Sequence, residues 1–280
     1  MRAPEFELDH VGIAVGDLDA AQRTYARLGF TLSSRSFHSA PPADGGKPLT
    51  TGTGNHCVML ERGYVELIGV TDPGYRGRLL ADLARYAGIH IVAFGTEDAP
   101  ALAARLARTG YEVKAARVLN RDIVERGRPA RLGFAIVDLP ATLLPEGHFL
   151  AIQHLTRDDL WQPHLLTHAN GAKGLAHLTV CMADPADFAR RLAAALGAEA
   201  RSAGTETFEI ELAAGLVRAT SPAGLARRYT GVAPPVLPWL AGIAIAVDEL
   251  APTAAFLARA GVTLREGAHG ARFVPPGEAA

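Results

Sequence analysis

The sequence predicts an α+β fold of four repeated βαβββ modules that pair into half-open barrels, with the last module incomplete. A strand-like stretch followed by an amphipathic helix that ends in glycine occurs four times in the 280 residues. Further strand-like stretches follow each helix, three in the first three modules and two in the fourth, and such ordered similarity indicates a repeat. A single module cannot by itself bury the apolar faces of both its sheet and its helix. Two sheets side by side can curl around a cup, with the helices outside.

The first module shows the pattern most clearly. Asp17 can cap its helix, whose apolar residues recur at helical spacing until Gly29 ends it. A turn at 61–63 separates two strands and indicates a hairpin. The remaining features expected here are strands at 9–15, 30–37, 56–60 and 64–70 and a Pro- and Gly-rich loop at 40–54.

The other three modules repeat this order. In the second we expect a strand at 88–96, a helix at 97–110 and strands at 111–119, 130–139 and 148–155. In the third we expect a strand at 175–182, a helix at 184–197 and strands at 198–203, 207–212 and 216–221. In the fourth we expect a strand at 240–250, a helix at 251–261 and strands only at 262–268 and 271–277.

The repeats divide the chain into two pairs of modules. Residues 1–156 form the first pair, which carries the candidate metal site, 157–173 form a connector, and 174–280 form the second pair. The missing strand of the fourth module leaves a sheet edge that another copy of the chain could cover, so a homodimer is one expectation.

Composition narrows the classes of partner. A net charge of −1 gives no general attraction for nucleic acid or an anionic membrane. No apolar run reaches the ~18 residues that a membrane-spanning helix needs. The first ten residues contain no apolar signal core, so we expect a cytoplasmic protein. Cys57 and Cys181 lie in strand-like runs without a CxxC partner, which favours buried thiols in a reducing compartment.

Three stretches, 8–30, 52–70 and 154–174, resemble the glyoxalase-like domain family. That family belongs to the vicinal oxygen chelate superfamily, with glyoxalase I, extradiol dioxygenases and bleomycin-resistance proteins. The resemblance covers roughly residues 8–180, and the last hundred residues match only in the repeat pattern. It implies the fold more firmly than the reaction.

The resemblance also implies a site for one divalent metal ion, because first and last strands of paired modules supply ligands in this superfamily. His10 and Glu66 correspond to the ligands of the first module, and His90 corresponds to the first ligand of the second. The fourth position falls best on Gln153, and a shift of one residue would place His154 there instead. These two neighbours point to opposite faces of a strand.

The residue types support such a site on physical grounds. His10 shares a strand face with Gly12 and Ala14, whose small size leaves room for a ligand. Glu66 stands among apolar neighbours, where an unpaired buried carboxylate is costly and pairing or metal coordination is the usual remedy. Two imidazoles and a carboxylate suit Fe(II), Mn, Zn, Ni or Co, and the metal would polarise a substrate oxygen, with Glu66 also able to move a proton. A metal-free arrangement of the same residues is the alternative.

Further residues could line the cup or its mouth. His38, Asn55 and His56 lie in or near a Gly-containing loop, at 50–56, that could contact the substrate or serve only as entry to a hairpin. In the third module His177 occupies the position that corresponds to His10, and it could line the cup or belong to the core. The last strand of that module has Arg218 at the position where an acidic residue would be expected. The segment 117–131 holds five arginines that could form a lid for an anionic substrate or a solvated loop: Arg117, Arg121, Arg126, Arg128 and Arg131.

The expected function is therefore a metal-dependent enzyme of the vicinal oxygen chelate type. Its substrate would be a small oxygenated molecule, a carbonyl, enediol or catechol, and its reaction that of a lyase, an isomerase or a dioxygenase. The alternative is a metal-free protein that sequesters an apolar or aromatic compound, as bleomycin-resistance members do.

Overall fold

A computed structural model of the chain describes residues 5–40, 49–268 and 272–274. Within these ranges thirteen strands form one open sheet, two more form a separate small sheet, and seven α-helices cover them. The expected α+β class is confirmed. None of the helices described is long and apolar enough to cross a membrane.

The first module follows the expected order. It comprises β1 (Glu7–Ala14), α1 (Leu18–Arg27), β2 (Ser36–Ala40), β3 (Leu49–Met59) and β4 (Tyr64–Val70). The first strand pairs in parallel with the last, and β3 and β2 then add in antiparallel fashion.

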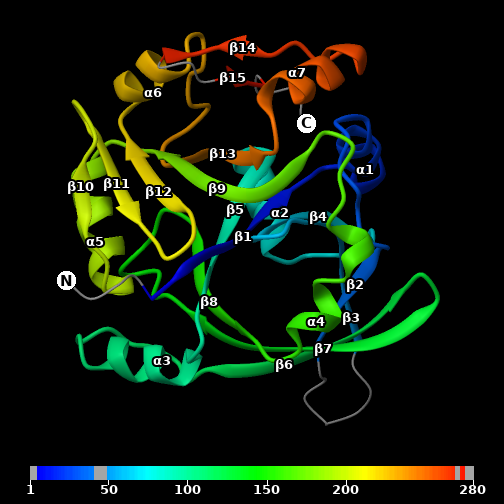
Figure 1. Cartoon of the computed structure of the whole chain (residues 1–280). Helices are drawn as coiled ribbons and strands as arrows, with labels where there is room; N and C mark the ends of the chain where they lie inside the picture. Colours follow the sequence, from blue (N-terminus) through cyan, green and yellow to red (C-terminus); the bar gives the residue numbers. More distant parts are fainter. Residues whose placement is uncertain (1–4, 41–48, 269–271, 275–280) are drawn as a thin grey trace.

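The second module repeats this pairing. After α2 (Arg78–Arg85) come β5 (Gly88–Gly95), α3 (Ala99–Ala107), β6 (Arg117–Glu125), β7 (Arg128–Asp138) and β8 (His148–His154). Strand β5 pairs in parallel with β8, and β7 and β6 follow. Antiparallel pairing of β1 with β5 joins the two modules, whose sheets curl toward each other around a cup (Figure 1).

The remainder of the chain begins with α4 (Arg157–Leu160) and the 3₁₀-helix η1 (Pro163–Leu165). The third module comprises β9 (Ala172–Cys181), α5 (Pro185–Leu196), β10 (Ala200–Ser202), β11 (Thr207–Glu211) and β12 (Leu216–Thr220). The last elements are α6 (Pro222–Arg228), β13 (Trp239–Val247), α7 (Leu250–Arg259), β14 (Arg265–Glu266) and β15 (Arg272–Phe273). As in the other modules, β9 pairs in parallel with β12, and β13 joins β9 as β5 joins β1.

The helices of the first three modules begin in the same way. Asp17, Asp98 and Asp184 are the N-caps of α1, α3 and α5. In each case a carboxylate oxygen accepts from the backbone N–H three residues later at 2.9 Å, which satisfies one of the free donors of the first turn. The repeat therefore extends to the local chemistry of helix initiation.

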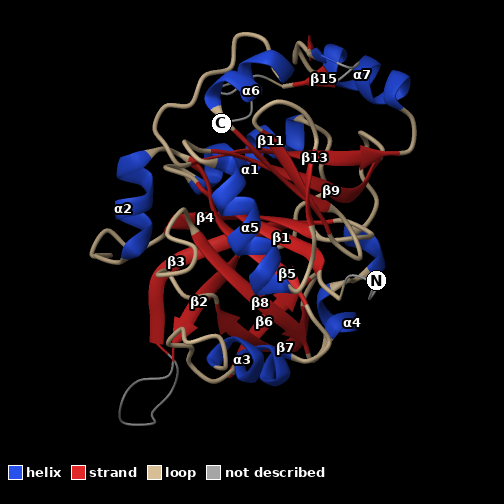
Figure 2. Cartoon of the chain, turned by 90° about the vertical axis from the view of Figure 1, so that its left-hand side faces the viewer, coloured by secondary structure: helices blue, strands red, loops and turns tan. Residues whose placement is uncertain are grey.

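The main core lies on the outer side of the cup and joins both halves of the chain. Phe94 of β5 and Phe149 of β8 face it with their rings 6.5 Å apart, and Phe188 of α5 packs against Phe149 at 5.8 Å. Figure 2 shows α5 across the middle of the molecule, between the two groups of strands. The outer face of the second module is thus covered by a helix of the third.

Four expectations about local structure are wrong. Of the strand expected at 111–119, only 117–119 lie in a strand, as the start of β6. The segment 31–35 is not a strand, because it is attached to β3 through Ser33, whose backbone N–H and side chain both bond to Cys57. The segment 50–56 lies inside β3 and is not a loop. The segment 117–131 is a β-hairpin of β6 and β7, so neither a lid nor a solvated loop describes it.

In the fourth module, β14 and β15 pair only with each other among the described residues. The strands expected at 262–268 and 271–277 are therefore short, and part of the second lies outside the described residues.

Candidate active site

The two N-terminal modules enclose a cavity of about 1120 Å³. One wall, from β1 to β4, is polar, and the opposite wall, from β5 to β8, is largely aliphatic. The polar wall presents His10, His38, Asn55, Tyr64 and Glu66, and the aliphatic wall presents Ile91, Leu132, Ile136, Leu150 and Ile152. The cavity can therefore hold a molecule with a polar and an apolar side.

His10 lies on β1 and faces the cavity beside a β-bulge. Between positions 8 and 10 the ladder of β1 with β5 shifts by one residue, which leaves Asp9 without a partner. A bulge re-aims side chains that would otherwise alternate. As a result the carboxylate of Asp9 accepts a hydrogen bond from Nδ1 of its own neighbour, His10, at 2.7 Å.

The second oxygen of Asp9 accepts from Nε2 of His154, at the end of β8, at 2.9 Å. Burial alone would raise the pKa of Asp9, but the hydrogen bonds from His10 and His154 outweigh it and hold the pKa well below its usual range. Since an ionised carboxylate only accepts, Nδ1 of His10 carries a proton. In the neutral ring Nε2 of His10 is then an acceptor, and it bonds to no described residue.

Tyr64 completes this part of the wall. Its ring stacks on His10 with centroids 4.2 Å apart and makes a T-shaped contact with Trp161 at 5.7 Å. Burial raises the pKa of Tyr64 well above its usual value, so its hydroxyl is a proton donor at neutral pH. Burial likewise raises the pKa of the nearby Cys57 thiol, which therefore stays protonated.

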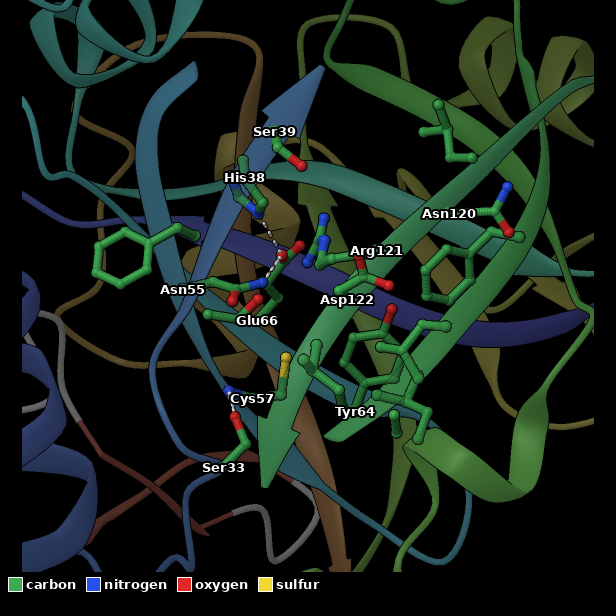
Figure 3. A pocket seen from close by; sticks show the side chains of 18 of the residues that line it. Ser33, His38, Ser39, Asn55, Cys57, Tyr64, Glu66, Asn120, Arg121 and Asp122 are labelled. Atoms are coloured by element: carbon green, nitrogen blue, oxygen red, sulfur yellow. Dashed lines mark hydrogen bonds and ion pairs between the residues drawn. The ribbon is translucent and has the colours of Figure 1, made fainter. Parts of the chain in front are cut away.

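Glu66 of β4 is the second carboxylate of the cavity. One of its oxygens accepts from the amide of Asn55 and from Nε2 of His38, the latter at 3.3 Å (Figure 3). Burial would raise its pKa, but the hydrogen bond from His38 and the charges of His38, His10 and Arg121 lower it to about 2. Glu66 is thus ionised, and His38 is itself positioned by Thr53 at 2.8 Å.

Two members of the expected metal set lie outside this cavity. His90 is the extra residue of a second bulge, in β5, and its Nε2 bonds to the carbonyl of Tyr86 at 2.8 Å while its ring stacks on Tyr86. Gln153 accepts a hydrogen bond from the backbone N–H of Ala99, in the first turn of α3. On β8 the cavity face belongs instead to the alternate residues, and His154 is on that side, bonded to Asp9.

The residues present therefore do not fit the four-ligand metal site. Only His10 and Glu66 of the set face the cavity, and the second module contributes Ile91 and Ile152 there, which are not ligands. Across the described residues no group of three or more His, Cys, Asp or Glu side chains has a geometry for holding a metal ion. The physical reason is the register of β5, where the cavity side falls one residue away from His90.

The other candidate residues divide in the same way. His38 and Asn55 line the cavity, whereas His56, one position from Asn55 on β3, points away and bonds to the carbonyl of Ser33. His177 lies in the third module, where its Nε2 is 3.1 Å from Arg218. Burial and the charge of Arg218 lower the pKa of His177 to about 4.

Sequence reasoning missed Asp9 and Tyr64, and it assigned Arg121 to the wrong kind of element. Asp9 stands beside His10 in the sequence, but strict alternation along a strand would place it on the far side of the sheet. Tyr64 shares a strand face with Glu66, which was the available signal. Arg121 lines the cavity from β6 and was expected in a loop.

Comparison with known proteins agrees with this architecture. The model of a family described as a glyoxalase-like domain matches residues 8–196. The chain belongs to this glyoxalase-like domain family. It is thereby a member of the vicinal oxygen chelate superfamily, as the resemblance implied. No curated protein matches the chain.

Several solved structures share the fold of this glyoxalase-like protein at low sequence identity. A hypothetical protein from Staphylococcus aureus aligns with a TM-score of 0.58 at 13% identity, over 77% of this chain and 86% of its own. A mutant of 4-hydroxymandelate synthase from Streptomyces coelicolor aligns with a TM-score of 0.54 at 17% identity, over 94% and 77%. A fusion of a xylose isomerase-like TIM barrel with 4-hydroxyphenylpyruvate dioxygenase aligns at 0.55 and 13%, over 95% of this chain and 40% of its own.

Proposed function

We propose that this glyoxalase-like protein is an enzyme that transfers a proton on a small carbonyl compound bound in the N-terminal cavity, with His10 as the base. One observation carries the proposal. Asp9 fixes the His10 ring so that its free acceptor nitrogen belongs to the cavity. A base oriented by a buried carboxylate is a recurrent arrangement in catalysis, because the carboxylate sets the tautomer and stabilises the imidazolium that forms.

The chemistry follows from the side chains of the polar wall. Nε2 of His10 removes a proton from the carbon next to the carbonyl, and Asp9 stabilises the charged ring. The protonated hydroxyl of Tyr64 donates to the carbonyl oxygen, where negative charge develops. In an isomerisation of a 2-hydroxy carbonyl compound the proton returns to the former carbonyl carbon, while the hydroxyl group on the deprotonated carbon gives up its proton and becomes the new carbonyl. In an elimination the electron pair instead expels a leaving group from the β-carbon, and the original carbonyl re-forms.

Glu66 has a supporting role in this scheme. Its carboxylate is ionised and held by Asn55 and His38, so it can accept a hydrogen bond from a hydroxyl group of the substrate. That preference favours oxygenated substrates, in agreement with the expectation from the family. The reaction class stays that of an isomerase or lyase.

Proton exchange tests the proposal directly. A panel of aldehydes, ketones and 2-oxo acids is incubated with the purified protein in D2O, and loss of the signal of the proton next to the carbonyl is followed by NMR. We expect at least one member to exchange with the wild type, and the rate to fall by about 100-fold or more in H10Q. His148→Gln is the matched control, because His148 also lines the cavity and bonds to an aspartate, Asp138, at 2.9 Å. The proposal is wrong if no compound exchanges faster with the wild type than with H10Q, or if H148Q abolishes exchange while H10Q does not.

The aliphatic wall favours one second candidate, a protein that sequesters an apolar compound. Sequestration needs the cavity but no base. Saturable binding of a panel member that is equal in the wild type and H10Q, without exchange in either, would support it in place of the enzyme.

A further inference from the structure

Arg121 is the unusual cation of the cavity. Four arginines line it, and three of them have carboxylate partners: Arg35 with Asp19, Arg117 with Asp138, and Arg131 with Asp122. Arg121 forms neither a hydrogen bond nor an ion pair with any residue that the structure describes. A guanidinium has five donors, and a partly buried one without an acceptor has hydrogen-bonding capacity left for a ligand.

The side chain of Arg121 is directed into the cavity, toward its polar wall. Alternation along β6 places Leu119, Arg121 and Ile123 on its inner side, and all three are partly buried. The charge of Arg121 lowers the pKa values of Glu66 and Cys57 across the cavity, so the guanidinium lies within electrostatic reach of both. Figure 3 shows it beside Glu66, on the side away from His38.

Glu66 does not neutralise this charge by direct contact. Its bonded oxygen already accepts from Asn55 and His38, and no ion pair joins Glu66 to Arg121. On the hairpin, the side chains that share the inner side with Arg121 are apolar: Leu119 and Ile123 on β6, and Leu132, its partner on β7. A ligand that satisfies Arg121 therefore needs an anionic group next to an apolar body.

We infer that Arg121 binds the carboxylate of a small organic acid whose apolar body lies on the aliphatic wall. This inference rests on the proposed function, since it names the substrate class of the same cavity. A carboxylate matches the planar fork of a guanidinium in a bidentate way. A 2-oxo acid would in addition present its keto oxygen toward Tyr64 and its neighbouring C–H toward His10.

Calorimetric titration of the full chain tests the inference. The probes are pyruvate, 2-oxoisocaproate and phenylpyruvate, each beside its uncharged methyl ester. We expect the acids to bind more tightly as the side chain grows, and each acid to bind more tightly than its ester. In R121Q the Kd of the acids should rise about tenfold or more while that of the esters stays the same, because only the charge-assisted contact is lost.

Three further variants make the result decisive. R121K, which keeps the charge, should recover part of the affinity, and R131Q, whose arginine already has a partner, should bind as the wild type does. Thermal unfolding of each variant shows whether it is folded. The inference is wrong if none of the acids binds the wild type, if acids and esters bind equally, or if R121Q binds the acids as the wild type does with only its stability reduced.

H10Q separates this inference from the proposed function. H10Q should lose proton exchange, while its binding of the acids should still exceed that of the esters and still depend on Arg121, because His10 is assigned to proton transfer. Retained, Arg121-dependent binding without any proton exchange in the wild type would refute the enzyme and leave the organic-acid site standing. Proton exchange that requires His10 but not Arg121 would support the proposed enzyme and refute the organic-acid site.

Discussion

Asp9 and His10 are neighbours in one strand, yet both belong to the same hydrogen-bonded cluster. In a regular strand their side chains would point to opposite faces. The bulge at Asp9 removes that restriction and lets one carboxylate hold two imidazoles, His10 and His154. The Nδ1 of His154 is buried and has no hydrogen-bond partner among the described residues, so Asp9 is the group that holds this ring.

Asp9→Asn should therefore separate orientation from binding. The substitution turns one of the two accepting oxygens into an NH2 donor and removes the charge that stabilises an imidazolium, so we expect proton exchange to fall by about 100-fold or more with ligand affinity unchanged. The free energy of unfolding should fall by about 1–3 kcal/mol, because buried donors lose an ionised partner. NMR exchange, calorimetry and urea unfolding measure the three effects.

Asp98→Asn is the control for that substitution, because Asp98 caps α3 at the surface and asparagine caps helices equally well. It should change neither exchange nor stability appreciably. If D9N retains the exchange rate of the wild type, Asp9 does not orient the base.

At the scale of elements, two strands and one glycine form the joint between the N-terminal modules. Strands β1 and β5 pair across the bottom of the cavity, where Gly12 lies opposite Ile91. A Cβ at Gly12 would stand 2.9 Å from Cβ of Ile91 and 3.1 Å from Ile68. Gly12 is therefore required because its neighbours approach so closely. The sequence suggested a different reason, namely that a small residue leaves room for a ligand.

Gly12→Ala should lower the free energy of unfolding by about 1–3 kcal/mol, since an extra methyl group in a filled space forces its neighbours apart. The matched control is Gly242→Ala on β13, where an added Cβ meets nothing within 4 Å. Urea denaturation of both variants measures the difference. Equal stabilities would show that the joint yields easily and that Gly12 is not a packing requirement.

The β6–β7 hairpin shows why the arginines were misplaced. The sequence of β6 is RVLNRDIVE, in which charged and apolar residues come largely in pairs, so the period-two pattern of a strand is weak. Pairing with β7 turns Arg121 inward, whereas Asp122 and Val124 stay exposed. The same segment thus supplies the cation proposed for the ligand and a solvated outer face.

At the scale of the whole molecule, helix α5 of the third module packs against the second module, on the side of its sheet that faces away from the cavity. Phe188 of α5 is fully buried and packs on Phe149 of β8, and Arg191 of the same helix bonds to Glu146. In the third module the sheet carries Arg218, which is bonded to Glu209 and His177. We assign this half a supporting role in the fold.

Phe188→Ala should destabilise both halves together. Removing a buried ring leaves a cavity in the shared core and should cost about 3–5 kcal/mol in the free energy of unfolding. Hydrogen exchange should accelerate in β5 and β8 as well as in α5. The control is Leu250→Ala on α7, whose side chain is 49% exposed. Faster exchange confined to the third module would mean that the halves are independent.

The sequence by itself determined the repeat, the order of strands and helix within each module, and the starts of α1, α3 and α5. These features follow from local rules: apolar spacing, Asp at the N-cap, and Gly where a helix ends. They placed β1, α1, β4, β5 and β8 close to their observed positions. The resemblance to the glyoxalase-like family selected His10, Glu66, His38 and Asn55, all of which line the cavity.

Only the tertiary structure decided which face of each strand meets the cavity. Register depends on pairing between distant strands, and a single bulge exchanges inside for outside. The bulge at Asp9 brings to His10 a carboxylate that the sequence did not predict. The bulge at His90 accompanies a register in which Ile91, and not His90, faces the cavity from β5. The repeat of a histidine in sequence therefore did not become a repeat of a site.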